Sequence, residues 1–204
     1  IENGHIFSSQ ADSEVLLHGF EQWGEEVVNH LRGMFAFVIF NKNDGTIFGA
    51  RDMFGIKPLY YTIGDNSFIF GSEIKAFLHH PEFKKQLNEQ TLAHYLSFQY
   101  SPCEETFFKG VYKLPPAHSF TFKDGEIVKK RYFKPEFKTD PGVVDFYADE
   151  IDKVIRESVS AHKIADVEVG SFLSSGIDSS YIAQAANVDK TFTVGFESDD
   201  GDRY

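Results

Sequence analysis

Residues 172–180 read FLSSGIDSS, and this stretch decides the fold of the C-terminal part of the chain. The apolar run from Val167 to Leu173 is typical of a buried strand, and the small residues after it predict a turn. A helix is predicted from Ser179 to Ala186 and a second strand from Thr191 to Phe196. Strand, helix and strand in this order form a βαβ unit, the seed of a parallel sheet. The predicted fold of this part is therefore α/β.

The turn itself has residue types that suit an anion. Backbone N–H groups at such a turn and at the start of the next helix favour negative charge, and Gly176 permits close backbone approach. Ser174, Ser179 and Ser180 add hydroxyl donors. Asp178 fits a phosphate site if Mg²⁺ is shared between its carboxylate and the phosphate oxygens. Spacing alone leaves a second interpretation open, a small-residue turn whose serine caps the helix.

The first part of the chain has the pattern of an antiparallel sheet with helical cover, an α+β arrangement. Turn signals such as Asn43-Asp44-Gly45 separate the strand-like runs, which favours hairpins. The run from Met34 to Phe40 is apolar at odd and even positions, so we expect both of its faces to be covered. Strands are predicted at 34–40, 46–50, 59–62, 67–71, 119–122 and 126–132. Helices are predicted at 11–31, with an interruption near residue 23, at 72–80 and at 88–98.

Composition changes between Lys134 and Gly142, where prolines and charged residues predict a linker. Asp140-Pro141 is typical of an N-cap followed by proline in the first helical turn. The helix expected after it carries one apolar face, formed by Tyr147, Ile151, Val154, Ile155 and Val159. The chain begins with Ile1 rather than Met, and it ends eight residues after the last predicted strand. We therefore expect a fragment cut at both ends, with the rest of the α/β domain beyond Tyr204.

Composition excludes several classes of protein. The 204 residues include 31 acids and 20 bases, a formal charge of −11, which argues against nucleic-acid binding. The longest apolar run is too short to span a bilayer, so no membrane partner is expected. Cys103 is the only cysteine, which rules out an internal disulfide and favours a cytoplasmic location.

Residues 173–180 resemble the pyrophosphate loop, S-G-G-x-D-S-S, of the ATP pyrophosphatases, which cleave ATP between its α and β phosphates. The resemblance implies that Leu173, Ser174, Ser175, Gly176, Asp178, Ser179, Ser180 and Val194 bind ATP. Within this set, the resemblance implies that Leu173 and Val194 flank the nucleotide, and the chemistry of its carboxylate assigns Asp178 to Mg²⁺. Ser175 departs from the pattern, where a glycine is usual, and serine fits there unless the position needs a positive φ.

Three further segments resemble the glutaminase domain of the glutamine-hydrolysing asparagine synthetases. They read LRGMFAF at 31–37, ARDMFGIKPLYY at 50–61 and FGSEIKA at 70–76, and KLPPAH at 113–118 fits the same family. The resemblance covers nearly the whole chain in order. It implies the C-terminal part of a class II amidotransferase domain at 1–133, a linker at 134–142 and the first part of the ATP-binding synthetase domain at 143–204.

The resemblance implies an N-terminal-nucleophile hydrolase with an αββα sandwich, followed by the start of a parallel-sheet domain. In that family an N-terminal cysteine releases ammonia from glutamine. ATP and Mg²⁺ then convert aspartate to β-aspartyl-AMP, which the ammonia converts to asparagine. The implied partners are glutamine, aspartate and ATP, and a homodimer is an open option.

The catalytic cysteine is expected before Ile1, so no catalytic residue is assigned in this chain. Cys103 lies mid-chain without the free α-amino group that would serve as its base, and we interpret it as an ordinary thiol. Asp12 resembles the aspartate that holds the α-amino group of glutamine, although a plain helix N-cap is also physically sound. Arg51 and Asp52 are expected to pair, and His79, His80, His94, His118 and His162 lack metal-ligand spacing.

Two alternatives remain open. The first keeps this architecture with another acceptor, as in enzymes resembling β-lactam synthetase or the polysaccharide amidotransferases, because the residues that select aspartate are expected after Tyr204. The second is a non-catalytic module that has lost its nucleophile.

Overall fold

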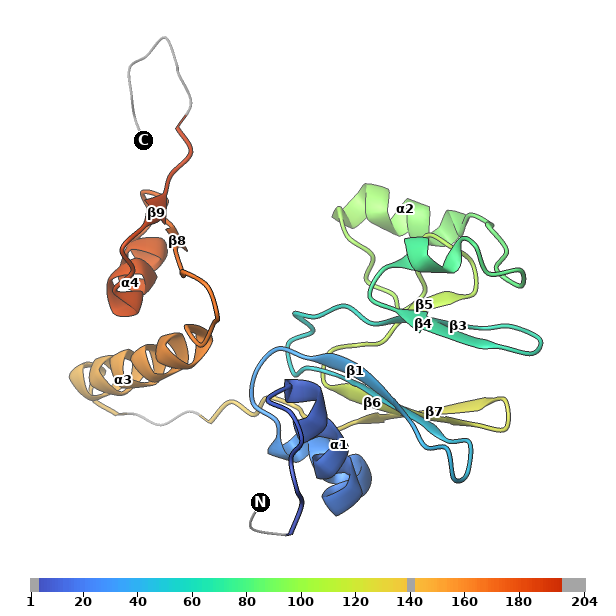
Figure 1. Cartoon of the computed structure of the whole chain (residues 1–204). Helices are drawn as coiled ribbons and strands as arrows, with labels where there is room; N and C mark the ends of the chain where they lie inside the picture. Colours follow the sequence, from blue (N-terminus) through green and yellow to red (C-terminus); the bar gives the residue numbers. More distant parts are fainter. Residues whose placement is uncertain (1–3, 139–141, 196–204) are drawn as a thin grey trace. The chain divides into compact units, whose positions relative to one another are not determined.

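The computed structural model describes residues 4–138 and 142–195 (Figure 1). The chain divides into two compact units, Ile1–Glu136 and Phe137–Tyr204. This division falls inside the segment that the sequence predicts to be a linker, and the domain bounds 1–133 and 143–204 stay predictions. Each unit is described by itself below.

The first unit is built on two antiparallel sheets. The larger sheet has the order β1 (Ala36–Phe40), β2 (Ile47–Arg51), β6 (His118–Lys123) and β7 (Glu126–Arg131). The smaller sheet has the order β4 (Phe68–Gly71), β3 (Tyr60–Ile63) and β5 (Val111–Lys113). The expected hairpins β1–β2, β3–β4 and β6–β7 are therefore confirmed. Strand β5 is absent from the sequence prediction because three residues are too few to show a period.

The inner faces of the two sheets pack against each other. Leu59, Leu114 and Phe120 are buried between them. The ring of Phe68 from the smaller sheet stacks on Phe122 from the larger one, with centroids 4.3 Å apart. Aromatic residues in offset contact add to the free energy gained from burial, so these rings fix the two sheets face to face.

Helices cover both outer faces. Helix α1 (Asp12–Trp23) and the 3₁₀ helix η1 (Gly24–His30) lie on the larger sheet, where Val27 and Val28 join Phe48 in a second core. The 3₁₀ helix η2 (Ile74–Phe77) and helix α2 (Glu89–Phe98) lie on the side of the smaller sheet (Figure 1). This four-layer arrangement confirms the predicted αββα sandwich.

Three details correct or sharpen the predicted elements of this unit. The short helix expected at 72–80 is confirmed in part, because it forms only as the four-residue 3₁₀ helix η2 between β4 and Pro81. The interruption near Trp23 is confirmed, since α1 ends there and η1 follows. Strand β1 contacts both cores, Phe37 on one face and Val38 on the other, as its apolar pattern predicts.

The expected pairing of Arg51 with Asp52 is wrong, although both residues are buried. The Arg51 guanidinium donates to the carbonyls of Lys57 (2.6 Å), Leu114 (2.7 Å) and Gly55. The Asp52 carboxylate accepts from the backbone N–H groups of Phe54, Ile56 and Lys57 at 2.9–3.1 Å. Each charge is therefore satisfied by backbone groups instead: Asp52 by the loop that follows β2, and Arg51 by the same loop and by Leu114.

The second unit contains α3 (Val144–His162), β8 (Ser171–Phe172), α4 (Ile177–Ala186) and β9 (Thr191–Phe192). Strands β8 and β9 are parallel, with Ser171 opposite Thr191, which confirms the βαβ unit. The hydroxyl of Tyr181 donates to Asp152 Oδ1 at 2.5 Å and joins α4 to α3.

Both strands of this unit are shorter than predicted, and Val167 and Phe172 are largely exposed. The predicted apolar face of α3 is present, but Ile151 and Val154 on it are also exposed within the described residues. The N-cap predicted at Asp140-Pro141 lies outside the described residues. Helix α3 begins at Val144, and its N-cap Val143 makes no side-chain capping bond. None of the helices in the described ranges is long and apolar enough to cross a membrane.

Candidate functional site

The loop between β8 and α4 is the candidate nucleotide site, and the parallel strands position its start. The N–H of Leu173 donates to the carbonyl of Phe192 at 2.9 Å. The hydroxyl of Thr193 donates back to the carbonyl of Leu173 at 2.7 Å. Leu173 and the segment that leads to Val194 therefore lie side by side. Val194 itself is exposed.

The Ser179 hydroxyl ties the loop closed. Its Oγ lies 2.8 Å from Ser174 Oγ and 3.2 Å from the N–H of Ser174, which donates to it. The carbonyls of Ser174 and Gly176 each lie 3.0 Å from the same oxygen, so either can accept its single proton. The N–H of Gly176 donates to Ser174 Oγ at 3.3 Å, and Ser180 Oγ donates to the Gly176 carbonyl at 2.9 Å. The loop thus folds on its own serines.

Four other N–H groups of this loop are left without an acceptor among the described residues. They belong to Ser175, Ile177, Asp178 and Ser179, at and just before the first turn of α4. Unsatisfied N–H groups at a helix N-terminus carry partial positive charge, which favours a bound anion. The arrangement fits the phosphate groups of a nucleotide.

Gly176 opens the space in front of these groups. Its φ of −79° is ordinary for any residue, so the backbone does not require glycine there. A Cβ at this position would come within 4 Å of only two atoms, Ser174 Oγ at 3.3 Å and Ser179 Oγ at 3.8 Å. Ser175 is not among the residues with positive φ, so the serine at the position usually held by glycine fits the local backbone.

Asp178 does not cap α4. The N-cap residue is Gly176, which has no side chain, so the interpretation of this turn as a serine-capped one is also wrong. The Asp178 carboxylate lies in the first turn and makes no hydrogen bond or ion pair with another described residue. A free carboxylate beside four free N–H groups has the oxygen chemistry that suits Mg²⁺ shared with phosphate.

Asp12 lies in the first unit, at the start of α1. The N-cap of this helix is Ala11 without a side-chain bond, so the capping interpretation of Asp12 is wrong. Its exposed side chain lines a cavity of about 380 Å³ together with Phe35, Lys57 and Ser72. Helix α1, strand β1 and the segments around Lys57 and Ser72 thus place a free carboxylate at a cavity that can receive a small molecule.

Cys103 is exposed, and its Sγ lies 3.5 Å from His94 Nδ1. Because the residue lies mid-chain, it lacks the α-amino base that an N-terminal nucleophile uses.

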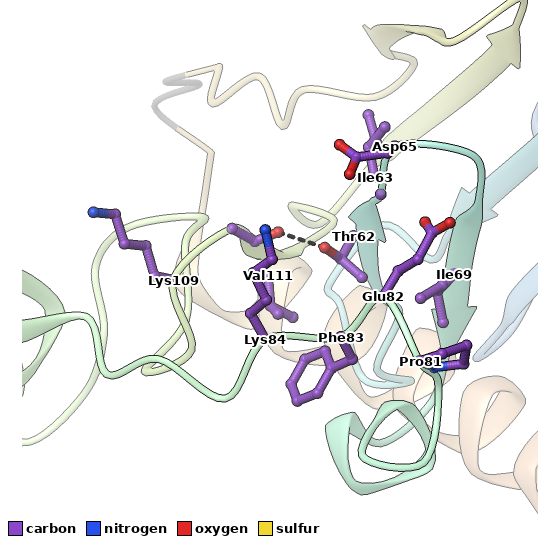
Figure 2. Close-up of a pocket in the computed structure, with 12 residues that line it drawn as sticks. Thr62, Ile63, Asp65, Ile69, Pro81, Glu82, Phe83, Lys84, Lys109 and Val111 are labelled. Carbon is purple, nitrogen blue, oxygen red and sulfur yellow. Dashed lines mark hydrogen bonds between the residues drawn. The ribbon is translucent and has the colours of Figure 1, made fainter.

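A different cavity, of about 360 Å³, lies beside the β3–β4 hairpin (Figure 2). There Glu82 accepts from Ser67 Oγ at 2.6 Å and from the N–H of Asn66 at 3.2 Å, and these bonds hold the pKa of its carboxyl below the usual range. The Glu82 carboxylate therefore holds the turn between β3 and β4 in place.

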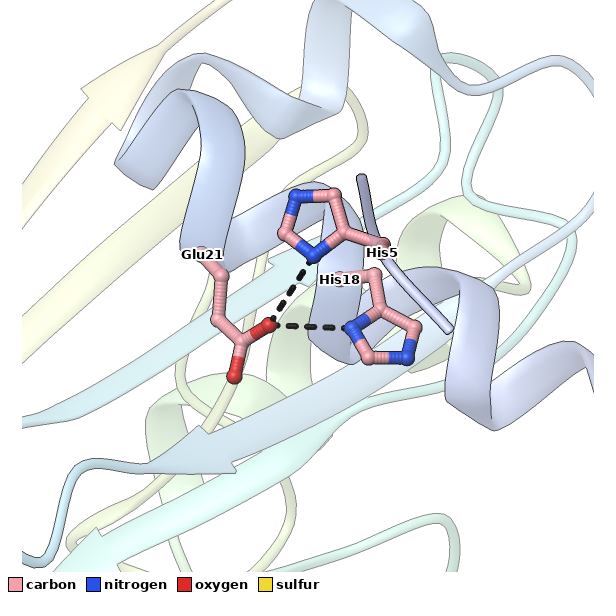
Figure 3. Close-up of side chains that lie close together, drawn as sticks. All are labelled: His5, His18 and Glu21. Carbon is pink, nitrogen blue, oxygen red and sulfur yellow. Dashed lines mark hydrogen bonds and ion pairs between the residues drawn. The ribbon is translucent and has the colours of Figure 1, made fainter. Parts of the chain in front are cut away.

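One cluster of potential metal ligands has no recognisable pattern in the sequence. His5, His18 and Glu21 bring three potential ligand atoms within 4.8 Å of one another (Figure 3). His18 and Glu21 have the i, i+3 spacing of one helix face, but His5 lies before the helix, in a segment without regular secondary structure. No sequence period could therefore join His5 to the other two.

Residues 1–133 match the glutamine amidotransferase domain family, and the chain belongs to it. Residues 150–204 match the asparagine synthase family. The chain is 44% identical to asparagine synthetase [glutamine-hydrolyzing] 1 of Bacillus subtilis, over 95% of this chain and 31% of that protein. It is 35% identical to asparagine synthetase [glutamine-hydrolyzing] 3 of the same organism, over 97% of this chain and 34% of that protein. The chain thus spans about a third of the length of these curated relatives.

Among solved structures, glutamine phosphoribosylpyrophosphate amidotransferase from B. subtilis, complexed with ADP and GMP, matches with a TM-score of 0.43 and 16% identity. The match covers 97% of this chain and 42% of that one.

Proposed function

We propose that the whole protein is an ATP-dependent ligase that makes asparagine from aspartate with ammonia released from glutamine. The observation that carries the proposal is the serine-tied loop at the start of α4, with four free N–H groups and a free carboxylate. The names of the relatives and the two family matches along one chain support the same activity.

In this proposal the loop holds the pyrophosphate portion of ATP. The N–H groups of Ser175, Ile177, Asp178 and Ser179 donate to phosphate oxygens, while Ser174 and Ser179 fix the loop. Gly176 leaves the backbone accessible, and Ser180 closes the first helical turn. Leu173 and Val194, at the ends of neighbouring strands, flank the adenine.

The chemistry at this loop is the departure of pyrophosphate. The β-carboxylate of aspartate attacks the α-phosphorus of ATP, which gives β-aspartyl-AMP, and ammonia then displaces AMP to give asparagine. Donors fixed before the reaction stabilise the charge that collects on the leaving pyrophosphate, at no cost in reorganisation. Mg²⁺, held by Asp178 together with phosphate oxygens, would supply further neutralisation of that charge.

On the glutaminase side, Asp12 is proposed to hold the α-amino group of glutamine. Its carboxylate is available because no described residue engages it. The proposal places the amide-cleaving nucleophile outside these 204 residues and gives Cys103 no part in hydrolysis. A cytoplasmic location and a homodimer complete the proposal.

The test is to incubate the whole protein with glutamine, aspartate, ATP and Mg²⁺ and to quantify asparagine, glutamate, AMP and pyrophosphate. Equal amounts of asparagine and AMP are expected. AMP formed only when another carboxylate acceptor replaces aspartate would instead indicate an enzyme like β-lactam synthetase or a polysaccharide amidotransferase. Absence of both glutamate and AMP formation would indicate a non-catalytic module.

A further inference from the structure

Two histidines and a glutamate meet beside α1, and none of the three belongs to the candidate nucleotide loop or to the cavity at Asp12. His18 and Glu21 lie on the helix, and His5 comes from the segment that precedes it (Figure 3). The Oε2 atom of Glu21 lies 2.9 Å from His18 Nδ1 and 3.4 Å from His5 Nδ1. Both rings therefore present the same nitrogen to one carboxylate oxygen.

The other nitrogen of His5 is already engaged. Its Nε2 lies 3.3 Å from Gln22 Oε1, an atom that can only accept, so this contact favours the tautomer with the proton on Nε2. In a neutral ring the Nδ1 atom then has a lone pair, and this lone pair faces an oxygen of Glu21. Two electron-rich atoms 3.4 Å apart repel each other unless a proton or a cation lies between them.

His18 meets the same conflict. Its Nε2 is buried without a hydrogen-bond partner and lies 3.6 Å from Glu14 Oε1. Glu14 is itself fixed, because it accepts from the N–H groups of Ser8 and Ser9 at 2.6 and 2.7 Å. A proton on Nε2 would point at this fixed carboxylate and would leave the Nδ1 lone pair facing Glu21.

A carboxylate behind a histidine is the arrangement that orients metal-bound imidazoles. In this cluster Glu14 stands behind His18 and the Gln22 side chain stands behind His5, so both rings can turn an unprotonated Nδ1 toward one point.

We propose that His5, His18 and Glu21 form a binding site for a divalent transition-metal cation of the Zn²⁺ class. The ligands are the two Nδ1 atoms and Glu21 Oε2, and water completes the coordination. Imidazole and carboxylate suit Zn²⁺ and its neighbours rather than Mg²⁺ or Ca²⁺.

Ligands at about 2.0–2.1 Å from a tetrahedral metal lie about 3.3 Å apart. The 3.4 Å separation already matches, and the 2.9 Å separation needs to open by a few tenths of an ångström. Glu21 is 63% exposed, which gives the ion a path from solvent.

The site would fasten the segment before α1 to the helix. His5 belongs to that segment. Among the described residues, the segment is otherwise held to the helix by hydrogen bonds from Ser8 and Ser9 to Glu14 and by the contact of His5 with Gln22. A bound metal ion adds a link that the unfolded chain cannot make, so binding should raise thermal stability.

The experiment titrates the whole protein with Zn²⁺ alone, in the absence of nucleotide, by calorimetry, and repeats the titration with Co²⁺ followed by visible absorption. All proteins carry Cys103→Ser, since the Cys103–His94 pair is a second place where such ions could bind. The variants His5→Gln and Glu21→Gln remove one ligand each, Glu14→Gln removes only the carboxylate behind His18, and His79→Gln is the matched histidine control.

We expect one Zn²⁺ site that is lost in His5→Gln and Glu21→Gln, unchanged in His79→Gln, and weakened about 10- to 100-fold in Glu14→Gln. Because His5 lies outside the helices and strands of the described residues, loss of Zn²⁺ binding in His5→Gln is not expected to come from unfolding of α1. Circular dichroism checks the fold of each variant. The same Zn²⁺ affinity in His5→Gln and His79→Gln, or no Zn²⁺ binding at all, would overturn the proposal and leave a protonated cluster.

Discussion

The hydroxyl oxygens of Ser174 and Ser179 lie 2.8 Å apart, across a turn whose neighbouring backbone N–H groups have no acceptor in the part of the chain that the structure describes. This contact is local in sequence, but it sets the shape of the whole loop, because Ser179 Oγ also meets the N–H and carbonyl of Ser174. Removal of that one oxygen should therefore disturb the loop more than removal of a neighbouring serine hydroxyl would.

Ser179→Ala should raise the KM for ATP about tenfold or more, since the loop loses bonds worth about 0.5–1.5 kcal/mol each. Pyrophosphate release at varied ATP concentration measures the change in the whole protein. Ser180→Ala is the control, because Ser180 Oγ makes a single bond, to the Gly176 carbonyl. Equal effects of the two substitutions would contradict the role given to Ser179.

Gly176→Val should abolish ATP use and leave glutamine hydrolysis largely intact. The φ of −79° accepts any residue, and the Cβ contact of 3.3 Å with Ser174 Oγ needs only a small shift of that hydroxyl, whereas the branched side chain would crowd the space beside the free N–H groups. Each donor lost to a charged oxygen costs about 1.5–3 kcal/mol. AMP and glutamate are measured in parallel, with Gly176→Ala as the smaller step, and AMP formation at the normal rate in the Val variant would refute the site.

Asp178→Asn separates a magnesium ligand from a structural residue. Because Asp178 neither caps α4 nor bonds to another described side chain, the change should leave the melting temperature almost unchanged. Loss of a hard anionic ligand should lower adenylation by orders of magnitude and shift its Mg²⁺ dependence to higher concentration. A Mg²⁺ titration of AMP production decides the matter, and an unchanged profile would remove the metal role.

Asp52→Asn should lower the free energy of unfolding of the first unit by about 2–3 kcal/mol. Both carboxylate oxygens of buried Asp52 accept backbone N–H groups, whereas an amide has only one oxygen that can accept. Urea denaturation of the whole protein, followed by a probe in this unit, measures the loss. The control is Asp44→Asn in the exposed β1–β2 turn, where the carboxylate accepts one backbone N–H, from Thr46. The control should cost clearly less.

Because of Glu14, the contact between residues 4–9 and α1 should weaken at low pH. The N–H of Ser8, and then the Ser9 hydroxyl, lower the pKa of Glu14 to about 2 in the folded protein, against about 4.3 in an unfolded chain. A lowered folded pKa gives stability that is fully present above about 4.3 and is lost as the pH falls toward about 2.

Amide exchange of Ser8 and Ser9 between these pH values, corrected for the intrinsic pH dependence of exchange, measures this release. Glu14→Gln should remove most of the pH dependence, and a variant that keeps it would show that another group is responsible.

The sequence by itself determined the features that depend on neighbouring residues. Strand-like runs separated by turn signals located the β1–β2, β3–β4 and β6–β7 hairpins, and the FLSSGIDSS stretch located the strand–turn–helix order of the second unit. In each case the decisive interaction lies within a few residues along the chain.

Only the tertiary structure decided which groups have partners. It showed that Arg51 and Asp52 bind loop backbone instead of each other, that Asp12 and Asp178 are free of capping bonds, and that three-residue β5 completes a sheet. It also brought His5 beside His18 and Glu21. The physical reason is that the spacing of residues along a helix or strand predicts which face each side chain occupies. Its partner comes from another segment, and only the folded chain brings that segment to the same face.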